Sequence, residues 1–252
     1  MHPDLSSQYV FVSGAGRGLG RSVARHLARC GAVVGVSDID VTSCNETAQL
    51  VKDAGGQAHA FPGDLGRRAT YLEAAAAFAK VGGGRLDAVV NNAAHLRYEP
   101  VEDVTEETFE KMVNIGLKAV VWGTQALLAH YDPARGGAIV NMASPVAYRG
   151  YPNTTIYSSI KSAIVGLTHT LAAELGPRNV RVNAVAPASV PTPGALQYVD
   201  SVEYERRART IPLRRLGAEA DNDNAIAFLL SKEASFISGT VLHVDGGVVA
   251  SM

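Results

Sequence analysis

Tyr157 and Lys161 have the clearest chemical potential in this chain, because they stand four positions apart in a predicted helix. Helical geometry places residues i and i+4 on one face, about one turn apart. A phenol ordinarily loses its proton near pH ~10 and is therefore a poor base at neutral pH. A fixed ammonium one turn away favours the phenolate, so the pair predicts a general acid/base whose tyrosine has a lowered pKa.

Two further features extend this chemistry. Ser144 precedes Tyr157 in the chain and offers a hydroxyl that can polarise a substrate oxygen. An apolar strand near the N-terminus is followed by a turn with glycines at positions 14, 18 and 20. Such a turn aims backbone N–H groups and a helix N-terminus at a pyrophosphate, although close packing alone can also demand glycine. Together these features predict hydride transfer between a dinucleotide and an alcohol or ketone.

The choice of dinucleotide depends on acidic residues that follow predicted strands. Asp38 ends the second strand, where a carboxylate accepts hydrogen bonds from the adenosine ribose hydroxyls and repels a 2′-phosphate. Arg17 favours the opposite choice, because a guanidinium pairs with that phosphate. We predict NAD, since the repulsion acts directly at the ribose. Asp38 is alternatively a helix N-cap, a role also open to Asp40 and Thr42, and Asp64 either accepts from the adenine amino group or caps the next helix.

The order of elements along the chain predicts the fold. Short apolar or β-branched runs alternate with longer helical patterns, which is typical of βαβ units. The predicted strands are 9–13, 32–37, 57–61, 86–91, 138–142, 180–185 and 240–244, and the predicted helices lie around 19–30, 42–54, 68–80, 105–131, 154–175 and 222–231. We predict one α/β domain spanning residues 1–252, a doubly wound Rossmann-type parallel sheet of about seven strands with helices on both faces.

Residues 188–217 depart from this alternation, because Pro191, Pro193 and Pro212 flank a polar helical pattern. The segment follows a strand end, at the edge where open α/β sheets bind ligands. We predict a lid on the substrate side of the domain, with a solvated surface excursion as the alternative.

Composition argues against several other classes of protein. The 252 residues are 47% hydrophobic and carry a formal net charge of −1, which gives no electrostatic basis for binding nucleic acid or an anionic membrane. We find no unbroken apolar stretch of ~18 residues, and the first residues lack the pattern of a signal peptide. Cys30 and Cys44 are too few for a disulfide scaffold and lack metal-site spacing. We therefore expect reduced thiols, no metal and a cytoplasmic location.

With these residues assembled, the chain resembles the short-chain dehydrogenase/reductase family, in its compact single-domain branch, over about residues 10–247. The resemblance rests on the joint order of motifs that are each common alone: the glycine turn, Asn91-Asn92-Ala93-Ala94, Asn114, Ser144, Tyr157-x-x-x-Lys161, Pro187 with Thr192, and Val244-Asp245-Gly246-Gly247. It implies an NAD(P)-dependent alcohol dehydrogenase or ketone reductase. It also implies a homotetramer in which helices 105–131 and 154–175 pair across one interface.

The resemblance assigns roles to matching positions. Tyr157 would exchange a proton with the substrate oxygen, and Ser144 would steady the charge that develops there. Lys161 would hold the nicotinamide ribose, Asn114 would position a water that links the lysine to solvent, and Asn91 would support the adenosine side. The cofactor set implied as a whole is Gly14, Arg17, Gly18, Leu19, Gly20, Asp38, Asp64, Leu65, Asn91, Ala93, Tyr157, Lys161, Pro187, Val190 and Thr192.

Three positions depart from the family pattern. Ala94 and Ala188 stand where glycine is usual, and Ile160 stands where a small or hydroxylated residue is commoner. Alanine at position 188 would cost on the order of 1 kcal/mol if its φ were positive.

Substrate contacts are expected from residues that flank the catalytic ones. The expected set is His95, Ser144, Val146, Tyr151 and Leu196, with Tyr198 and Tyr204 from the lid. Its aromatic and apolar character predicts a medium-sized alcohol or ketone. Four arginines nearby either recognise an anionic group or are simply solvated: Arg149, Arg206, Arg207 and Arg209.

The leading hypothesis is an NAD-dependent dehydrogenase that acts on a secondary alcohol. An NADPH-dependent carbonyl reductase is the close alternative. A non-catalytic NAD-binding regulatory module would share the fold, but the intact catalytic residues argue against it.

Overall fold

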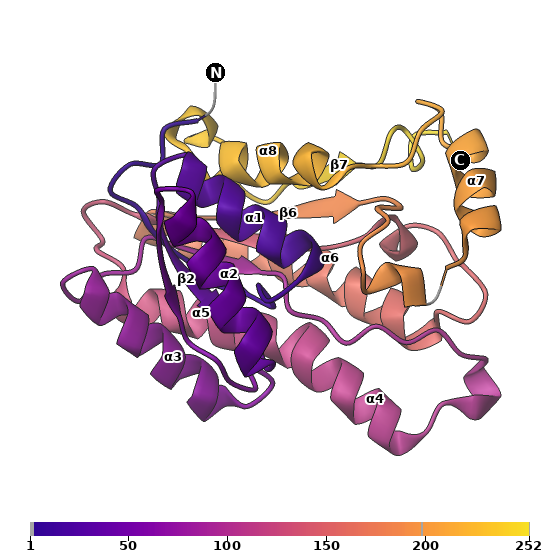
Figure 1. Ribbon diagram of the computed structural model, residues 1–252, viewed down its shortest axis with the longest axis horizontal. Helices are drawn as coiled ribbons and strands as arrows, with labels where there is room; N and C mark the ends of the chain where they lie inside the picture. Colours follow the sequence, from indigo (N-terminus) through magenta and orange to yellow (C-terminus); the bar gives the residue numbers. More distant parts are fainter. Residues whose placement is uncertain (1–2, 198, 252) are drawn as a thin grey trace.

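The computed structural model describes residues 3–197 and 199–251. Seven parallel strands form one sheet in the order β3-β2-β1-β4-β5-β6-β7 (Figure 1). The strands are β1 Tyr9–Ser13, β2 Val33–Ser37, β3 Gln57–Ala60, β4 Ala88–Asn91, β5 Gly137–Met142, β6 Val180–Pro187 and β7 Val241–Val244. The doubly wound fold class predicted from the sequence is confirmed.

Helices cover both faces of this sheet. The α-helices of the described residues are α1 Gly18–Arg29, α2 Val41–Asp53, α3 Arg68–Val81, α4 Glu106–Val113, α5 Ala119–His130, α6 Thr155–Leu175, α7 Ser201–Thr210 and α8 Glu219–Leu230. α1, α2 and α8 pack on one face, and α3, α5 and α6 pack on the other (Figure 1). α7 lies beyond the carboxyl end of the sheet, in the segment predicted to form a lid.

Strand β1 shows why its sequence reads as an unbroken apolar run. Val10 and Val12 point into the core on the α1 and α8 side, whereas Phe11 points to the other face. The ring of Phe11 lies 5.7 Å from that of Tyr71 and 6.0 Å from that of Phe78, both on α3. Alternate residues of a parallel strand are thus buried on opposite faces, and both faces favour apolar side chains.

The order of strands reverses at β1, and the glycine turn lies at this switch point. Gly14 has a φ of +62°, and a Cβ there would approach the Ala93 Cα to 2.7 Å. A Cβ on Gly20 would overlap the carbonyl oxygen of Gly14. The Asn92 side-chain amide donates to the carbonyls of Ser13 and Gly14 at 3.0 and 2.9 Å. The turn is therefore fixed against the loop after β4, at the crevice where such folds bind ligands.

The single helix predicted over 105–131 is interrupted. A π-helical turn, Asn114–Lys118, joins α4 to α5, and such turns often mark functional sites. The run Glu106–His130 is also long and apolar enough, by length and composition, to cross a membrane, contrary to the expectation that no segment would meet that criterion. Of its most apolar window, 44% is buried inside the protein. Core helices of water-soluble proteins pass the same test, and α5 packs on α3 and β4.

A backbone hydrogen bond joins the two ends of the lid segment, residues 188–217. The N–H of Gly217 donates to the carbonyl of Ser189 at 3.0 Å, so the two ends of the segment meet. A short 3₁₀ turn, Ala195–Gln197, and α7 lie between these ends. The helical pattern predicted between the prolines corresponds to α7.

The interface between α1 and α8 holds a buried carboxyl, Asp223, which is 2% exposed. The Ser22 hydroxyl donates to its Oδ2 at 2.6 Å, whereas its Oδ1 has no hydrogen-bond partner among the described residues. Burial raises the pKa of Asp223 from 3.8 to about 6. Between these two values the folded protein retains a proton that the unfolded chain releases, so its free energy of unfolding falls as the pH rises.

We expect Asp223→Asn to remove this pH-dependent loss of stability. The amide keeps an acceptor for Ser22 but does not ionise, and the loss in the wild type is on the order of 2 to 3 kcal/mol. Urea unfolding at pH 4, 5, 6 and 7.5 measures it. An equally steep decline in the variant between pH 4 and 6 would assign the effect to other groups.

Candidate active site

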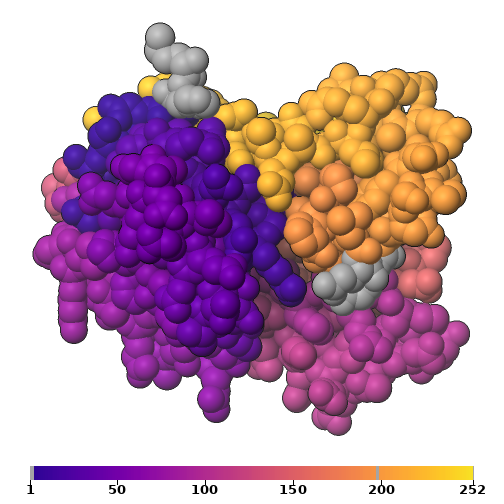
Figure 2. Space-filling model, viewed as in Figure 1, coloured from indigo at the N-terminus to yellow at the C-terminus, as the bar shows by residue number. Residues whose placement is uncertain are grey.

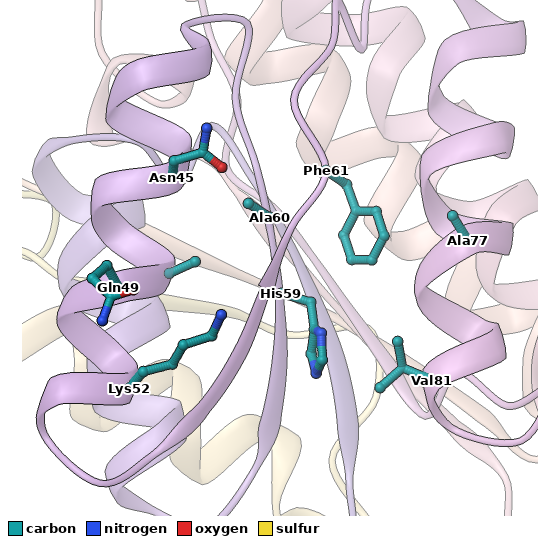
Figure 3. A pocket seen from close by; sticks show the side chains of 9 residues that line it. Asn45, Gln49, Lys52, His59, Ala60, Phe61, Ala77 and Val81 are labelled. Atoms are coloured by element: carbon teal, nitrogen blue, oxygen red, sulfur yellow. The ribbon is translucent and has the colours of Figure 1, made fainter.

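A cleft of about 1140 Å³ runs along the carboxyl edge of the sheet, and residues that follow β1, β2, β4, β5 and β6 line it. Figure 2 shows it opening between the orange lid segment and the magenta region of α4. A second hollow of about 470 Å³ lies between α2 and α3 beside the edge strand β3 (Figure 3). His59 and Lys52 are its ionisable lining residues, with no carboxylate or thiol among the described residues there. The cleft is therefore the candidate active site.

Nearly all of the predicted cofactor set lines this cleft. The residues are Gly14, Arg17, Gly18, Leu19, Gly20, Asp38, Asp64, Leu65, Ala93, Tyr157, Lys161, Pro187, Val190 and Thr192. They come from loops that are far apart in sequence but meet where parallel strands end. This shape and lining fit a dinucleotide laid across the switch point.

Asn91 is the exception and requires a correction. Its side chain accepts from the Tyr71 hydroxyl at 3.0 Å and donates to Asn141 Oδ1 at 2.9 Å, inside the core. Because side chains alternate along β4, Asn91 points into the α3 and α5 layer and away from the cleft. Asn92, the next residue, braces the glycine turn instead.

Asp38 is not the N-cap of α2, the alternative role considered for it. The N-cap of α2 is Asp40, whose carboxylate accepts from Ser43 N at 2.7 Å. Asp38 lies in the cleft at the end of β2 and accepts from Gly16 N at 2.9 Å and from Asp40 N at 3.1 Å. An ionised carboxylate has about four acceptor positions, so capacity remains for ribose hydroxyls.

Asp64 likewise lines the cleft and does not cap α3, whose N-cap position is Arg67. Its Oδ1 accepts from Gly66 N at 3.0 Å, which orders the turn before the helix. Arg17 is exposed at the same end of the cleft.

The loops after β1 and β6 face each other across the cleft. A Cβ on Gly18 would lie 3.3 Å from the Thr192 Cβ. Positive φ outside glycine is confined, within the described chain, to Ser7, Asn153, Asn179 and Arg214. Ala188 therefore carries none of the backbone strain considered for it.

Three reactive side chains meet in the centre of the cleft. Ser144 follows β5, while Tyr157 and Lys161 lie on α6. The Lys161 Nζ lies 5.5 Å from the centroid of the Tyr157 ring and donates to the Met142 carbonyl at 2.6 Å. The Ser144 hydroxyl lies close enough to the Tyr157 hydroxyl to lower the pKa of the phenol. Asn114 also lines the cleft, as the first residue of the π-helical turn.

The electrostatics of this group differ from the sequence-based prediction. Burial raises the pKa of Tyr157 above its usual value, Tyr98 adds to this effect, and the Ser144 hydroxyl opposes it. Burial lowers the pKa of Lys161 to about 8. In the protein alone the pKa of Tyr157 is therefore shifted in the direction opposite to the one predicted from the sequence, because desolvation is the largest cause of the shift. Tyr157 is a neutral phenol that can donate a proton.

Tyr98 was not predicted from the sequence. Its ring meets that of Tyr157 edge-on, with centroids 5.7 Å apart and planes at 67°, and it lines the cleft. It lies in an irregular loop after β4, where no hydrophobic period marks a residue as facing the site. Only its proximity to the Asn motif could have suggested it.

Most of the predicted substrate residues line the cleft, namely His95, Ser144, Val146 and Tyr151, together with Tyr204 from α7. Leu196 requires a correction. It is 55% exposed on the 3₁₀ turn Ala195–Gln197, whose Ala195 faces the cleft in its place. The predicted contact at Tyr198 lies outside the described residues.

A hydroxyl, a phenol and a buried amine beside a glycine turn at the switch point define a dinucleotide-dependent oxidoreductase. Comparisons agree with this class. The family model described as enoyl-(acyl carrier protein) reductase matches residues 14–249. The chain is 37% identical to 4-formylbenzenesulfonate dehydrogenase of Comamonas testosteroni, over 97% of this chain and 98% of that protein. It is 33% identical to cyclopentanol dehydrogenase of Comamonas sp. strain NCIMB 9872, over 98% and 99% of the two chains.

Solved structures give the same result. One assigned to a short-chain alcohol dehydrogenase from Sinorhizobium meliloti 1021 is 37% identical, covers 99% of each chain and superposes with a TM-score of 0.93. Related structures hold NADH or NADP. The chain belongs to the short-chain dehydrogenase/reductase family, as its motifs predicted.

Proposed function

We propose that this protein is an NAD-preferring dehydrogenase that interconverts a secondary alcohol and its ketone. The observation that carries the proposal is the meeting of Ser144, Tyr157 and Lys161 in the cleft that begins at the glycine turn. A substrate oxygen placed between the Ser144 and Tyr157 hydroxyls receives two hydrogen bonds at the atom where charge develops.

The chemistry of the chain's own residues follows from this placement. In reduction, Tyr157 donates its proton to the carbonyl oxygen, as its raised pKa favours. In oxidation it accepts the hydroxyl proton, and Ser144 steadies the oxygen. NAD, when bound, supplies the hydride acceptor and a positive charge that favours the phenolate. Lys161 would hold the ribose hydroxyls, and Asn114 would position the water that returns the proton to solvent.

The preference for NAD is argued from Asp38. We expect Asp38→Ala to raise kcat/KM with NADP and lower it with NAD, shifting their ratio about 10- to 100-fold, because it removes both the repulsion of a 2′-phosphate and the ribose acceptor. Initial rates with the two cofactors measure it.

Asp38→Asn is the matched variant, because it retains an acceptor without the charge and should lose mainly the discrimination against NADP. A wild-type enzyme that works better with NADPH would instead support the carbonyl reductase hypothesis, for which Arg17 in the cleft is the supporting residue.

A ring-bearing substrate is favoured by apolar and aromatic side chains that line the cleft, Tyr98, Val146, Tyr151 and Tyr204. Two relatives are named for a cyclic alcohol and an aromatic aldehyde. A panel of cyclic and aromatic secondary alcohols, followed by NADH absorbance, tests the proposal. Tight NAD binding without turnover of any member would support a non-catalytic module.

We also infer a cytoplasmic homotetramer. The most apolar window of the run Glu106–His130 is 44% buried within one chain, which leaves surface for pairing. Cys30 and Cys44 are both free thiols, which suits a reducing compartment. Light scattering coupled to gel filtration measures the assembly, and a monomeric mass would contradict it.

A further inference from the structure

Besides Arg17 of the glycine turn, three arginines line the cleft. Arg149 follows the 3₁₀ turn Pro145–Ala147, and Arg206 and Arg207 lie on α7. Two separate segments therefore bring guanidinium groups to the substrate side. The hydride transfer proposed above requires no such charge.

One carboxylate orders two of these groups. Glu203 Oε2 lies 2.6 Å from Arg206 Nε, and its Oε1 lies 2.7 Å from both Arg206 Nη2 and Arg207 Nε. Hydrogen bonds from Arg206 and then Arg207 hold the pKa of Glu203 at about 2, so it is ionised at neutral pH. A single negative charge between two positive ones leaves the group with a net charge of about +1. Arg207 also reaches the Ser189 hydroxyl at 3.4 Å.

Arg149 adds a second positive charge. Its guanidinium carbon lies 5.2 Å from the centroid of the Tyr151 ring, and it forms no ion pair within the part of the chain that the structure describes. Arg206 lines the same cleft as Tyr151, and its ion pair with Glu203 raises its pKa. Tyr151 therefore contacts Arg149 directly and lines the cleft together with the arginines of α7.

The positive charge is local to this region. Helix α4 contributes two acidic residues and one basic residue to another wall of the cleft: Glu107, Glu110 and Lys111. The cleft therefore does not attract anions along its whole length. An anion would be recognised only in the part of the cleft lined by Arg149, Tyr151 and the arginines of α7.

We propose that this cluster binds a carboxylate or sulfonate group at the end of the substrate remote from the reacting carbon. The inference rests on the proposed function and names its substrate class: an anionic aryl secondary alcohol or ketone. Guanidinium forks pair with planar carboxylate and with sulfonate oxygens, and a guanidinium already stacked on a tyrosine loses less freedom on binding. Tyr98, Val146 and Tyr204 offer the surface for the ring between the two ends.

Two nearly isosteric alcohols test it, 4-(1-hydroxyethyl)benzoate and 1-(4-methylphenyl)ethanol, each with saturating NAD. We expect kcat/KM to favour the benzoate by about tenfold or more, chiefly through KM. Arg149→Gln and Arg206→Gln should each lower the ratio of the two kcat/KM values by about tenfold. Arg209→Gln is the matched control, because Arg209 lies on the same helix, pairs with Glu205 and is 77% exposed outside the cleft. It should leave the ratio unchanged.

Each outcome decides one of the two proposals. Turnover of both alcohols with no preference for the benzoate, or an equal loss for both in the arginine variants, overturns the anion site and leaves the dehydrogenase intact. If neither alcohol is oxidised, the dehydrogenase proposal fails for this class. Calorimetric binding of the benzoate to the NAD-saturated protein then decides the anion site. Binding that is about tenfold weaker in Arg149→Gln supports the site, and binding unaffected by either substitution overturns it.

Discussion

Replacing Tyr157 with phenylalanine is expected to lower kcat/KM by about 10²- to 10⁴-fold while leaving NAD affinity within about twofold. The variant keeps the ring that meets Tyr98 edge-on and lies 5.5 Å from the Lys161 amine, so the packing of α6 is unchanged. It removes the hydroxyl that exchanges the proton. The loss should therefore fall on the chemical step and spare cofactor binding.

Single-turnover rates and a fluorescence titration with NADH measure the two effects separately. Tyr98→Phe is a suitable control, because it retains a ring against Tyr157 and removes a hydroxyl to which no proton transfer is assigned. If Tyr157→Phe turned over within tenfold of the wild type, the acid/base assignment would have to move to another group in the cleft.

Replacing Lys161 with methionine is expected to abolish most turnover and yet to stabilise the protein. Lys161 is 5% exposed and has no carboxylate partner among the described residues; its amine donates to the Met142 carbonyl. Burial lowers its pKa from 10.5 to about 8, so a desolvated charge is present below that pH. Relieving it is worth on the order of 3 kcal/mol, less about 1 kcal/mol for the lost hydrogen bond.

The lowered pKa of Lys161 also determines how the free energy of unfolding changes with pH. Between pH 8 and 10.5 the unfolded chain binds more protons at Lys161 than the folded protein, so the wild-type free energy of unfolding rises with pH in that window. Lys161→Met should lack this rise, which denaturant unfolding without cofactor measures at pH 7, 8, 9 and 10. Lys52→Met removes an exposed lysine on α2 and should change neither stability nor turnover. A variant less stable than the wild type at pH 7 would contradict the account.

The strands of the sheet were largely predictable because buried parallel strands have a distinctive residue pattern. Residues buried on both faces read as continuous apolar runs, and β1 was predicted with the bounds that it has. The helices were predictable from the helical spacing of their apolar residues. The break between α4 and α5 was not, because a π-helical turn changes hydrogen bonding by one residue without a distinct residue pattern.

The site was predictable where chemistry dictates residue type, as at Ser144 and Tyr157. It was not predictable where adjacent residues compete for one role. Asn91 and Asn92 carry the same side chain, and only the alternation along β4 decides which enters the core. The pKa of Tyr157 depends on burial by loops that the sequence does not place.

The hydrogen bond between Gly217 and Ser189 has a consequence for how this enzyme type diversifies. Because the segment is pinned between the end of β6 and the start of α8, insertions or deletions between those two points alter the residues that cover the pocket without shifting the strands beneath. Longer excursions add only a slowly growing entropic cost. Selectivity for new molecules can thus evolve in this stretch independently of the machinery that moves the hydride.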